Sequence, residues 1–283
     1  MPNDTPVIDC QVHAYDRNDD SNYRAVLAGP ATVTGEEMVA AMDAVGVDGA
    51  LLISPFTIYG YDSSYCEGVA EAYPDRFGLI APFDPNSPTV AADVEAWAAR
   101  PGVVGARVVL NFEAVGGEHP GVDAIIAAGA AAGIPINVLC WQNLPELAAY
   151  ARRHANAQLV IDHVGLQQPF QPPPPDEPWA EIEQIIALAQ LDHVAIKISG
   201  ACTLSHEPFP YPDIWQPLGR IFEAYGLERC MWGTDWTRAT NLLTFEQGVE
   251  AFRVTDALSD DERAALMGGS LQQIYRWSPG ASG

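Results

Sequence analysis

Short apolar runs alternate with longer amphipathic stretches along most of the chain. The runs are rich in Val, Ile and Leu, and they lack the strict alternation of polar and apolar residues that a half-exposed strand shows. Such runs are typical of parallel strands that are covered on both faces. We therefore predict strands at residues 7–13, 49–54, 77–82, 103–110, 134–140, 159–163, 194–199 and 230–235.

The stretches between these strands carry helical patterns rich in Ala and Glu. We predict helices at residues 36–45, 63–73, 90–100, 121–132, 144–154, 179–191, 214–225 and 242–257. Strands that alternate with helices predict a parallel sheet whose crossover connections are helices. The favoured fold is a single α/β domain over residues 1–283, closed as a (β/α)8 TIM barrel. A doubly wound open sheet is the alternative, but no glycine-rich phosphate loop follows the first strand.

Two segments depart from this alternation. Residues 167–178 are rich in proline, which removes a helical donor and favours extended polyproline II structure. A domain linker is one interpretation, but strand and helix patterns of the same kind continue on both sides, which favours a loop within the barrel. The small, polar residues 278–283 are expected to form a frayed tail.

Composition narrows the partners and the location. The chain has 14 Lys and Arg against 37 Asp and Glu, a net charge of −23, so nucleic acid and anionic membrane surfaces are poor partners. We find no long apolar segment and no signal-peptide pattern at residues 1–6, so we expect a cytoplasmic protein acting on a small molecule, with a homo-oligomer left open. The five scattered cysteines are expected to be buried thiols.

Polar side chains end several of the predicted strands. Catalytic groups of such barrels lie at the C-terminal ends of the strands and in the loops that follow them. Buried polar groups at these ends must be paired or used, because they otherwise cost a few kcal/mol, on the order of 2–7. The strand-end candidates are Gln11, His13, Arg107, Asp162, His163, Lys197 and Asp235. For Asp235 a helix N-cap is the competing structural role, and for Arg107 and Lys197 it is a structural ion pair.

Aromatic residues follow several strand ends and predict a pocket for a planar or cyclic compound rather than a polyhydroxylated sugar. Some of these residues are expected to pack beneath the loops instead. Arg107, Lys197 and Arg238 are candidates to bind one carboxylate. The predicted substrate-binding residues are Gln11, Tyr15, Phe56, Arg107, Trp141, Lys197, His206, Tyr211 and Trp236.

Four motifs together resemble one family. They are Asp9-x-Gln11-x-His13, Asp162-His163-Val164-Gly165, Lys197-Ile198-Ser199-Gly200 and Met231-Trp232-Gly233-Thr234-Asp235-Trp236. These blocks resemble the amidohydrolase superfamily, in particular the amidohydrolase-2 branch with its pyrone-dicarboxylate and sugar-acid lactonases. The resemblance spans Val7 to about Tyr275. It implies a distorted (β/α)8 barrel that hydrolyses a cyclic ester or a related carbonyl compound.

The resemblance leaves the metal content open. The family usually opens with His-x-His, and here Gln11 stands at the first of these positions. A neutral amide is a weaker zinc ligand than imidazole, and the fifth strand ends without a histidine, so no binuclear centre is expected. Either a single divalent metal (zinc or manganese) binds His13, His163 and Asp235, or the site works without a metal.

The resemblance also implies roles for these residues. Asp235 would be the general base that activates water, while His163 and His13 orient the water or polarise the carbonyl. Without a metal, the oxyanion donors would be His13, Gln11 and Arg107. Two alternatives to a lactonase stay open: a non-oxidative decarboxylase of an aromatic acid, and a catalytically retired barrel that binds a small ligand.

Overall fold

The predicted strands form one parallel sheet. The computed structural model describes residues 5–16, 29–111 and 116–280. The strands follow one another in chain order around the sheet, and every neighbouring pair in it is parallel, which confirms the barrel prediction. They are β1 (Ile8–Val12), β4 (Gly49–Ile53), β5 (Phe77–Pro82), β6 (Val103–Val109), β7 (Ile136–Leu139), β8 (Leu159–Ile161), β9 (Val194–Lys197) and β10 (Cys230–Met231).

Backbone hydrogen bonds join the first strand to the segment that follows the last. The Cys10 amide donates to the Trp232 carbonyl at 3.0 Å, and the Asp235 amide donates to the Gln11 carbonyl at 3.0 Å. Gly233 lies at this seam, where a Cβ atom would stand 2.7 Å from Cys10 Sγ. A residue without a side chain therefore lets β1 approach β10 and nearly close the barrel.

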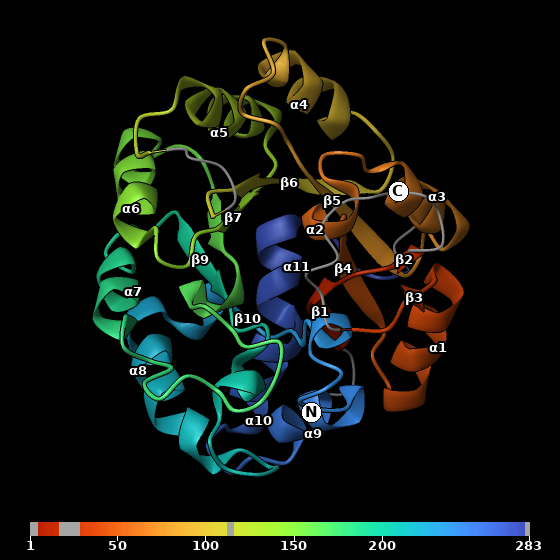
Figure 1. Cartoon of the computed structure of the whole chain (residues 1–283), viewed down its shortest axis with the longest axis vertical. Coiled ribbons are helices and arrows are strands. Elements are labelled where there is room, and N and C mark those ends of the chain that lie inside the picture. Colours follow the sequence, from red (N-terminus) through yellow and green to blue (C-terminus); the bar gives the residue numbers. More distant parts are fainter. Residues whose placement is uncertain (1–4, 17–28, 112–115, 281–283) are drawn as a thin grey trace.

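Helices surround the strands as a ring (Figure 1). All eight predicted helices are present, some of them a few residues shorter than expected. They are α1 (Gly35–Val45), α3 (Ser64–Ala72), α4 (Val90–Ala98), α5 (Pro120–Ala132), α6 (Leu144–Arg153), α7 (Ile182–Leu188), α8 (Trp215–Tyr225) and α9 (Phe245–Arg253). Helix α1 shows why its boundaries lie where they do. It begins with a capping box from Thr34 and ends at Gly46 in the left-handed conformation.

Several short elements were not predicted. They are the two-stranded ribbon of β2 (Tyr15–Asp16) and β3 (Thr32–Val33), and the helices α2 (Phe56–Tyr59), α10 (Asp260–Ala264) and α11 (Ser270–Tyr275). Helix α11 lies at the centre of the ring of strands (Figure 1). Its Leu271 and Tyr275, one helical turn apart, are buried in one cluster with Ile8, Leu51 and Val160. The helix therefore fills the interior of the barrel with apolar side chains.

The two atypical segments have different outcomes. Residues 167–178 contain neither helix nor strand, as predicted, and they lie between β8 and α7. The prediction of a frayed tail is wrong for residues 278–280. Gln272 donates to Ser278 at 2.9 Å, and the Gly280 amide donates to the Asp75 carbonyl at 2.9 Å. Residues 281–283 lie outside the described residues. All five cysteines are buried free thiols, and no described helix has the length and hydropathy to span a bilayer.

Candidate active site

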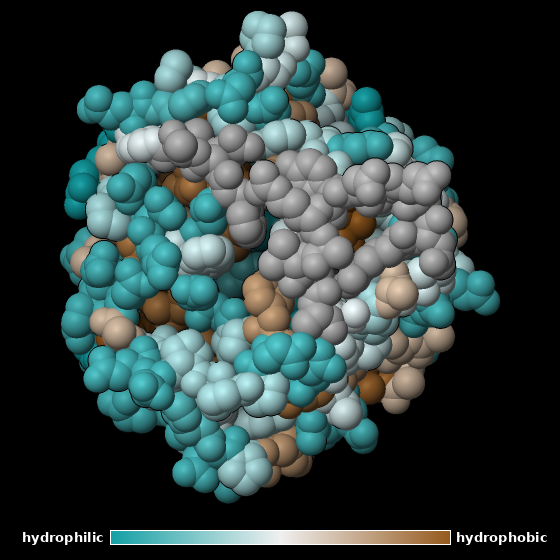
Figure 2. Space-filling model, viewed as in Figure 1, coloured by the Kyte–Doolittle hydropathy of each residue, from teal (hydrophilic) through white to brown (hydrophobic). Residues whose placement is uncertain are grey.

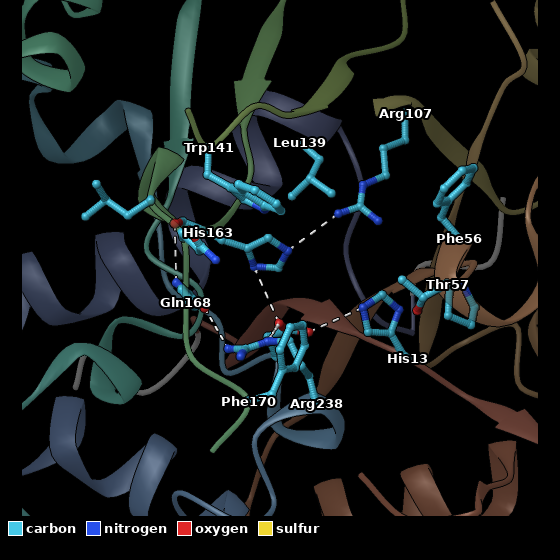
Figure 3. Close-up of a pocket in the computed structure, with 14 residues that line it drawn as sticks. His13, Phe56, Thr57, Arg107, Leu139, Trp141, His163, Gln168, Phe170 and Arg238 are labelled. Carbon is cyan, nitrogen blue, oxygen red and sulfur yellow. Dashed lines mark hydrogen bonds and ion pairs between the residues drawn. The ribbon is translucent and has the colours of Figure 1, made fainter. Parts of the chain in front are cut away.

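A cavity of about 290 Å³ opens at the C-terminal ends of the strands. This face of the molecule is mostly hydrophilic, and hydrophobic side chains are visible mainly in its recesses (Figure 2). The cavity is lined by His13, Pro55, Phe56, Thr57, Arg107, Leu139, Trp141, His163, Leu166, Gln167, Gln168, Phe170, Asp235 and Arg238. In Figure 3, His13, His163 and Arg238 point toward a common centre between the apolar walls. We call His13, His163, Asp235 and Arg238 the cavity quartet.

Asp235 is the centre of the cavity quartet. Its backbone is left-handed, with φ of 51°, and its side chain is 1% exposed. Oδ2 accepts a hydrogen bond from Arg238 Nε at 2.5 Å, whereas Oδ1 accepts none among the described residues. Burial alone would raise the pKa of Asp235, but His163 and Arg238 outweigh burial and hold this pKa well below its usual range. The carboxylate is therefore ionised, with one oxygen available.

His13 faces that oxygen through Nε2, at 3.3 Å from Asp235 Oδ1. Its Nδ1 lies 2.7 Å from the Ile53 carbonyl, which can only accept, so Nδ1 carries the hydrogen. Its Nε2 also lies 3.3 Å from the Gln11 side-chain nitrogen, which can only donate. In the neutral ring, Nε2 is consequently an acceptor. His13 Nε2 and Asp235 Oδ1 thus form a pair of facing acceptors between which a proton can pass.

His163 approaches the same carboxylate with Nδ1, at 3.6 Å from Asp235 Oδ2. Its Nδ1 also lies 3.2 Å from Ser199 Oγ, and its Nε2 lies 3.5 Å from an Arg107 nitrogen. Since the guanidinium can only donate, the geometry favours hydrogen on Nδ1. Burial lowers the pKa of His163 to about 4 although two carboxylates oppose the shift, so the ring is neutral at neutral pH.

A second group of polar side chains lies deeper in the barrel. We call Gln11, Arg107, Asp162 and Lys197 the buried quartet. Arg107 Nε donates to Asp162 at 2.8 Å, and Lys197 Nζ lies 3.0 Å from the other Asp162 oxygen and donates to Gln11 Oε1 at 2.9 Å. Burial opposes ionisation of Asp162, but Lys197 and Arg107 hold its pKa below the usual range. The two quartets together hold three cationic side chains and two carboxylates, so the site is locally positive in an acidic chain.

The arrangement does not fit a divalent metal ion. Among the described ranges, no group of three or more His, Cys, Asp or Glu side chains is placed to hold one. The Gln11 oxygen is taken by Lys197, so this residue presents its donating nitrogen to the site. Arg238 already occupies one oxygen of Asp235. A dication would also meet the net positive charge of the buried quartet, in which Arg107 and Lys197 share one carboxylate.

The structure brings six of the predicted site residues to the cavity: His13, Phe56, Arg107, Trp141, His163 and Asp235. Two more, Gln11 and Lys197, are completely buried beneath it and contact one another. Lys197 therefore has the structural pairing that was its alternative role. Gln11 contacts His13, which places it behind the cavity rather than in it.

Four predicted substrate-binding residues do not line the cavity. Tyr15 is buried in the core, and its hydroxyl donates to the Pro30 carbonyl at 3.3 Å. His206 is exposed on a loop that Asp213 holds through the His206 amide. Both residues follow strand ends as predicted, but neither side chain lines the cavity.

Tyr211 and Trp236, the other two, pack on neighbouring aromatic rings. Tyr211 has a left-handed backbone and is buried, and its ring meets Phe209 edge-on with centroids 5.9 Å apart. Trp236 stacks on Phe245 of α9 with centroids 5.2 Å apart. Packing beneath loops, the alternative stated for aromatic residues, accounts for both.

Sequence reasoning missed much of the remaining wall. The missed lining residues are Pro55, Thr57, Leu139, Leu166, Gln167, Gln168 and Phe170, and Arg238 was considered only as an anion ligand. Three of the missed residues lie in the proline-rich loop, which the sequence marks as unusual without indicating its direction. These three residues lie in a loop that follows a barrel strand, and this position was the sequence signal that could have identified them.

Comparison with curated proteins gives two informative relatives. The chain is 29% identical over 174 residues to an L-fucono-1,5-lactonase of Burkholderia ambifaria. This alignment covers 56% of this chain and 54% of that protein. It is 26% identical over 203 residues to a 4-sulfomuconolactone hydrolase of Hydrogenophaga intermedia. This second alignment covers 71% of this chain and 64% of that protein. The match thus spans between half and two thirds of the length of these relatives.

Comparison with solved structures supports the fold. An amidohydrolase of Burkholderia multivorans, solved with bound zinc, superimposes with a TM-score of 0.78 at 22% identity, covering 96% of this chain and 99% of that one. The model of the Amidohydrolase family matches residues 8–277, which include every strand of the barrel and both quartets. The chain belongs to the amidohydrolase family.

Proposed function

We propose that this protein hydrolyses a lactone, opening the ring of a small cyclic ester with water. The observation that carries the proposal is the pair of facing acceptors, Asp235 Oδ1 and His13 Nε2, 3.3 Å apart at the wall of the cavity. A water molecule at the carbonyl of a bound substrate can donate a hydrogen to Asp235 Oδ1, and His13 Nε2 lies close enough to receive the proton from there. The lactonases among the relatives support the same reaction class.

Asp235 is the base in this scheme, and His13 is the place to which the proton passes. The charges around Asp235 keep its pKa low, so a proton does not remain there. His13 Nε2 is near enough to take it and becomes the second donor nitrogen of an imidazolium. As the tetrahedral intermediate collapses, the ester C–O bond breaks, and the leaving oxygen takes this proton. Water thereby adds across the ester bond to give a hydroxy acid.

Arg107 is the donor that the proposal assigns to the developing oxyanion. It lines the cavity and is 3% exposed, and Asp162 fixes its guanidinium through Nε. A donor that is already oriented stabilises new negative charge without reorganisation, which is typically worth about 10² to 10³ in rate. The residues do not fit a metal ion, so no step passes through one.

The walls favour a flat, mostly apolar substrate. Phe56, Leu139, Trp141, Leu166 and Phe170 supply most of the surface around the polar centre. The polar side chains are largely engaged with one another, which leaves few partners for the hydroxyl groups of a sugar. A buried hydroxyl without a partner costs about 1–3 kcal/mol. The locally positive charge further suits a substrate with one carboxylate.

A panel of aryl, unsaturated and sugar lactones tests the proposal, with ring opening followed by proton release and product mass. We expect turnover of flat lactones, faster for those with one carboxylate than for neutral or polyhydroxylated ones. Carbon dioxide release from benzoate-type acids, lost on chelation, would favour a decarboxylase instead. Ligands that stabilise the protein without yielding product would favour a retired barrel. The homo-oligomer and the cytoplasmic location stay predictions.

A further inference from the structure

Arg238 uses all of its guanidinium nitrogens, and they join the loop after β10 to the proline-rich loop. Nε donates to Asp235 at 2.5 Å, NH2 donates to Gln168 Oε1 at 2.7 Å, and NH1 donates to the Pro169 carbonyl at 2.6 Å. The Phe170 ring lies against the guanidinium, with its centroid 5.3 Å from the guanidinium carbon. Because a guanidinium is rigid and planar, partners on one side of the plane set the direction in which Nε points.

Gln168 is itself held on both sides of its amide. Its side-chain nitrogen donates to the Ser199 carbonyl at 2.8 Å and to the His163 carbonyl at 3.3 Å, while its oxygen accepts from Arg238. Two acceptors on one side and a donor on the other fix which atom is nitrogen and which is oxygen. The side chain is buried, with 7% exposure.

Gly200 provides the space that Gln168 occupies. A Cβ atom at this position would stand 2.0 Å from Gln168 Oε1, and the backbone of Gly200 has φ of +70°. Both facts favour glycine at the end of the Lys197-Ile198-Ser199-Gly200 motif. The motif thus contributes Lys197 to Asp162, Ser199 to His163, and the empty volume at Gly200 to Gln168.

We propose that Gln168 is a positioning residue for Asp235, acting through Arg238. It holds the guanidinium so that Nε engages Oδ2, and Oδ1 is then left to face His13 and the attacking water. Its action on catalysis rests on the lactonase proposal, whereas its action on the geometry of the cavity quartet does not. A role limited to anchoring the proline-rich loop would leave the contact between Asp235 and His13 unchanged.

The ring nitrogens of His13 give a readout that requires no substrate. Gln168 does not contact His13, and its side-chain oxygen reaches His13 through Arg238 and Asp235. Its nitrogen donates only to backbone carbonyls, those of Ser199 and His163. In ¹⁵N-histidine-labelled full-length protein at fixed pH, we expect Gln168→Met to shift the His13 ring signals. Arg238→Lys, which keeps the charge but cannot bridge both partners, is expected to shift them as well.

The matched control is Gln142→Met. Gln142 also anchors the proline-rich loop, donating to Gln167 at 3.0 Å, without contacting Arg238. Unchanged His13 signals in a folded Gln168→Met protein would overturn the inference, as would an equal shift in Gln142→Met. If Gln168→Met does not fold, Gly200→Ala displaces the same side chain and serves in its place. Unchanged His13 signals in Gly200→Ala, or an equal shift in Gln142→Met, would then overturn the inference.

Kinetics then separate the two proposals. On a lactone that the wild type opens, Gln168→Met should lower kcat by about 10- to 10²-fold and should change KM less, since its main effect is to misplace the base even though Gln168 also lines the cavity. Loss confined to KM would contradict positioning. If the wild type opens no lactone, the proposed function fails, while the His13 signals still decide the role of Gln168.

Discussion

The two quartets are built from the same chemical groups but differ in what they leave unused. Each has a fully buried carboxylate in the segment that follows a strand, and the pKa of this carboxylate lies below its usual range. Asp162 lies between two cations, Arg107 and Lys197, one on each oxygen. Asp235 has Arg238 on one oxygen, and its other oxygen faces a histidine acceptor across 3.3 Å. A carboxylate with a cation on each oxygen is structural, whereas a carboxylate with a cation on only one oxygen keeps the other oxygen for reaction.

The largest expected effect comes from removing the reactive carboxylate. Asp235→Asn should lower the rate of lactone opening by about 10² to 10⁴, the usual weight of a general base, which corresponds to roughly 3–5 kcal/mol in the barrier. Steady-state rates on a flat lactone measure it, with the exposed Asp192→Asn as a control that should retain full activity. A folded Asp235→Asn enzyme with normal rates would show that another residue activates water.

Asp162→Asn should act first on stability, and it should also slow the reaction because Asp162 orients Arg107. It leaves the buried cations Arg107 and Lys197 without their common anion, and breaking a buried pair in this way costs about 3–5 kcal/mol. Urea unfolding of wild type and variant measures the change in the free energy of unfolding. If the variant were as stable as the wild type, the distinction between the quartets would not hold.

Protonation of His163 gives a somewhat smaller, pH-dependent effect. Burial lowers its pKa from 6.5 to about 4, so below pH 6.5 the unfolded chain takes up a proton that the folded protein refuses. The free energy of unfolding should therefore decrease as pH falls from about 6.5 to about 4, by roughly 3 kcal/mol from this residue. His163→Gln should lack this decrease.

Urea unfolding at several pH values compares the two proteins, and the carboxylates common to both largely cancel in the difference. If the free energies of unfolding of the wild type and His163→Gln change in parallel between pH 6.5 and 4, the pKa of His163 is not lowered in the folded protein.

The smallest expected effect is a loss of stability on removing a hydrogen bond beneath the buried quartet. The Tyr275 hydroxyl donates to Asn137 Oδ1 at 2.5 Å inside the barrel, and Tyr275→Phe removes this bond with little change in volume. We expect a loss of about 1 kcal/mol in the free energy of unfolding with unchanged kcat. Tyr73→Phe, in a partly buried residue outside the barrel interior, serves as the comparison. A change in kcat would connect this bond to the cavity quartet.

The sequence was sufficient for the barrel because each strand and helix leaves a local pattern. The period of the pattern separates the two element types, and the polar residues that end β1, β8 and β10 mark the active side. His13, His163 and Asp235 were found together for this reason. Helix α11 was missed because the π-helical turn Ala265–Gly269, which joins it to α10, interrupts the regular helical period of this run.

Side-chain direction beyond the strand ends was harder to predict. Gln11 and His13 have the expected spacing, but the sequence does not show that Lys197 takes the Gln11 oxygen and turns its nitrogen toward His13. Tyr15 and His206 follow strands as predicted, yet the turns after those strands place Tyr15 in the ribbon of β2 and β3 and bring the His206 amide to Asp213. Such turns depend on tertiary contacts, which no local pattern records.

The placement of α11 at the centre of the strands has a consequence for how the protein is made. Leu271 and Tyr275 are packed against Ile8 and Cys10 of the first strand, although they are separated from it by almost the whole chain. During synthesis, β1 emerges early, and the helix that fills the space beside it emerges late. The interior of the barrel therefore stays incomplete until translation has passed α11. Until then, a nascent chain exposes apolar strand surface that a chaperone would recognise.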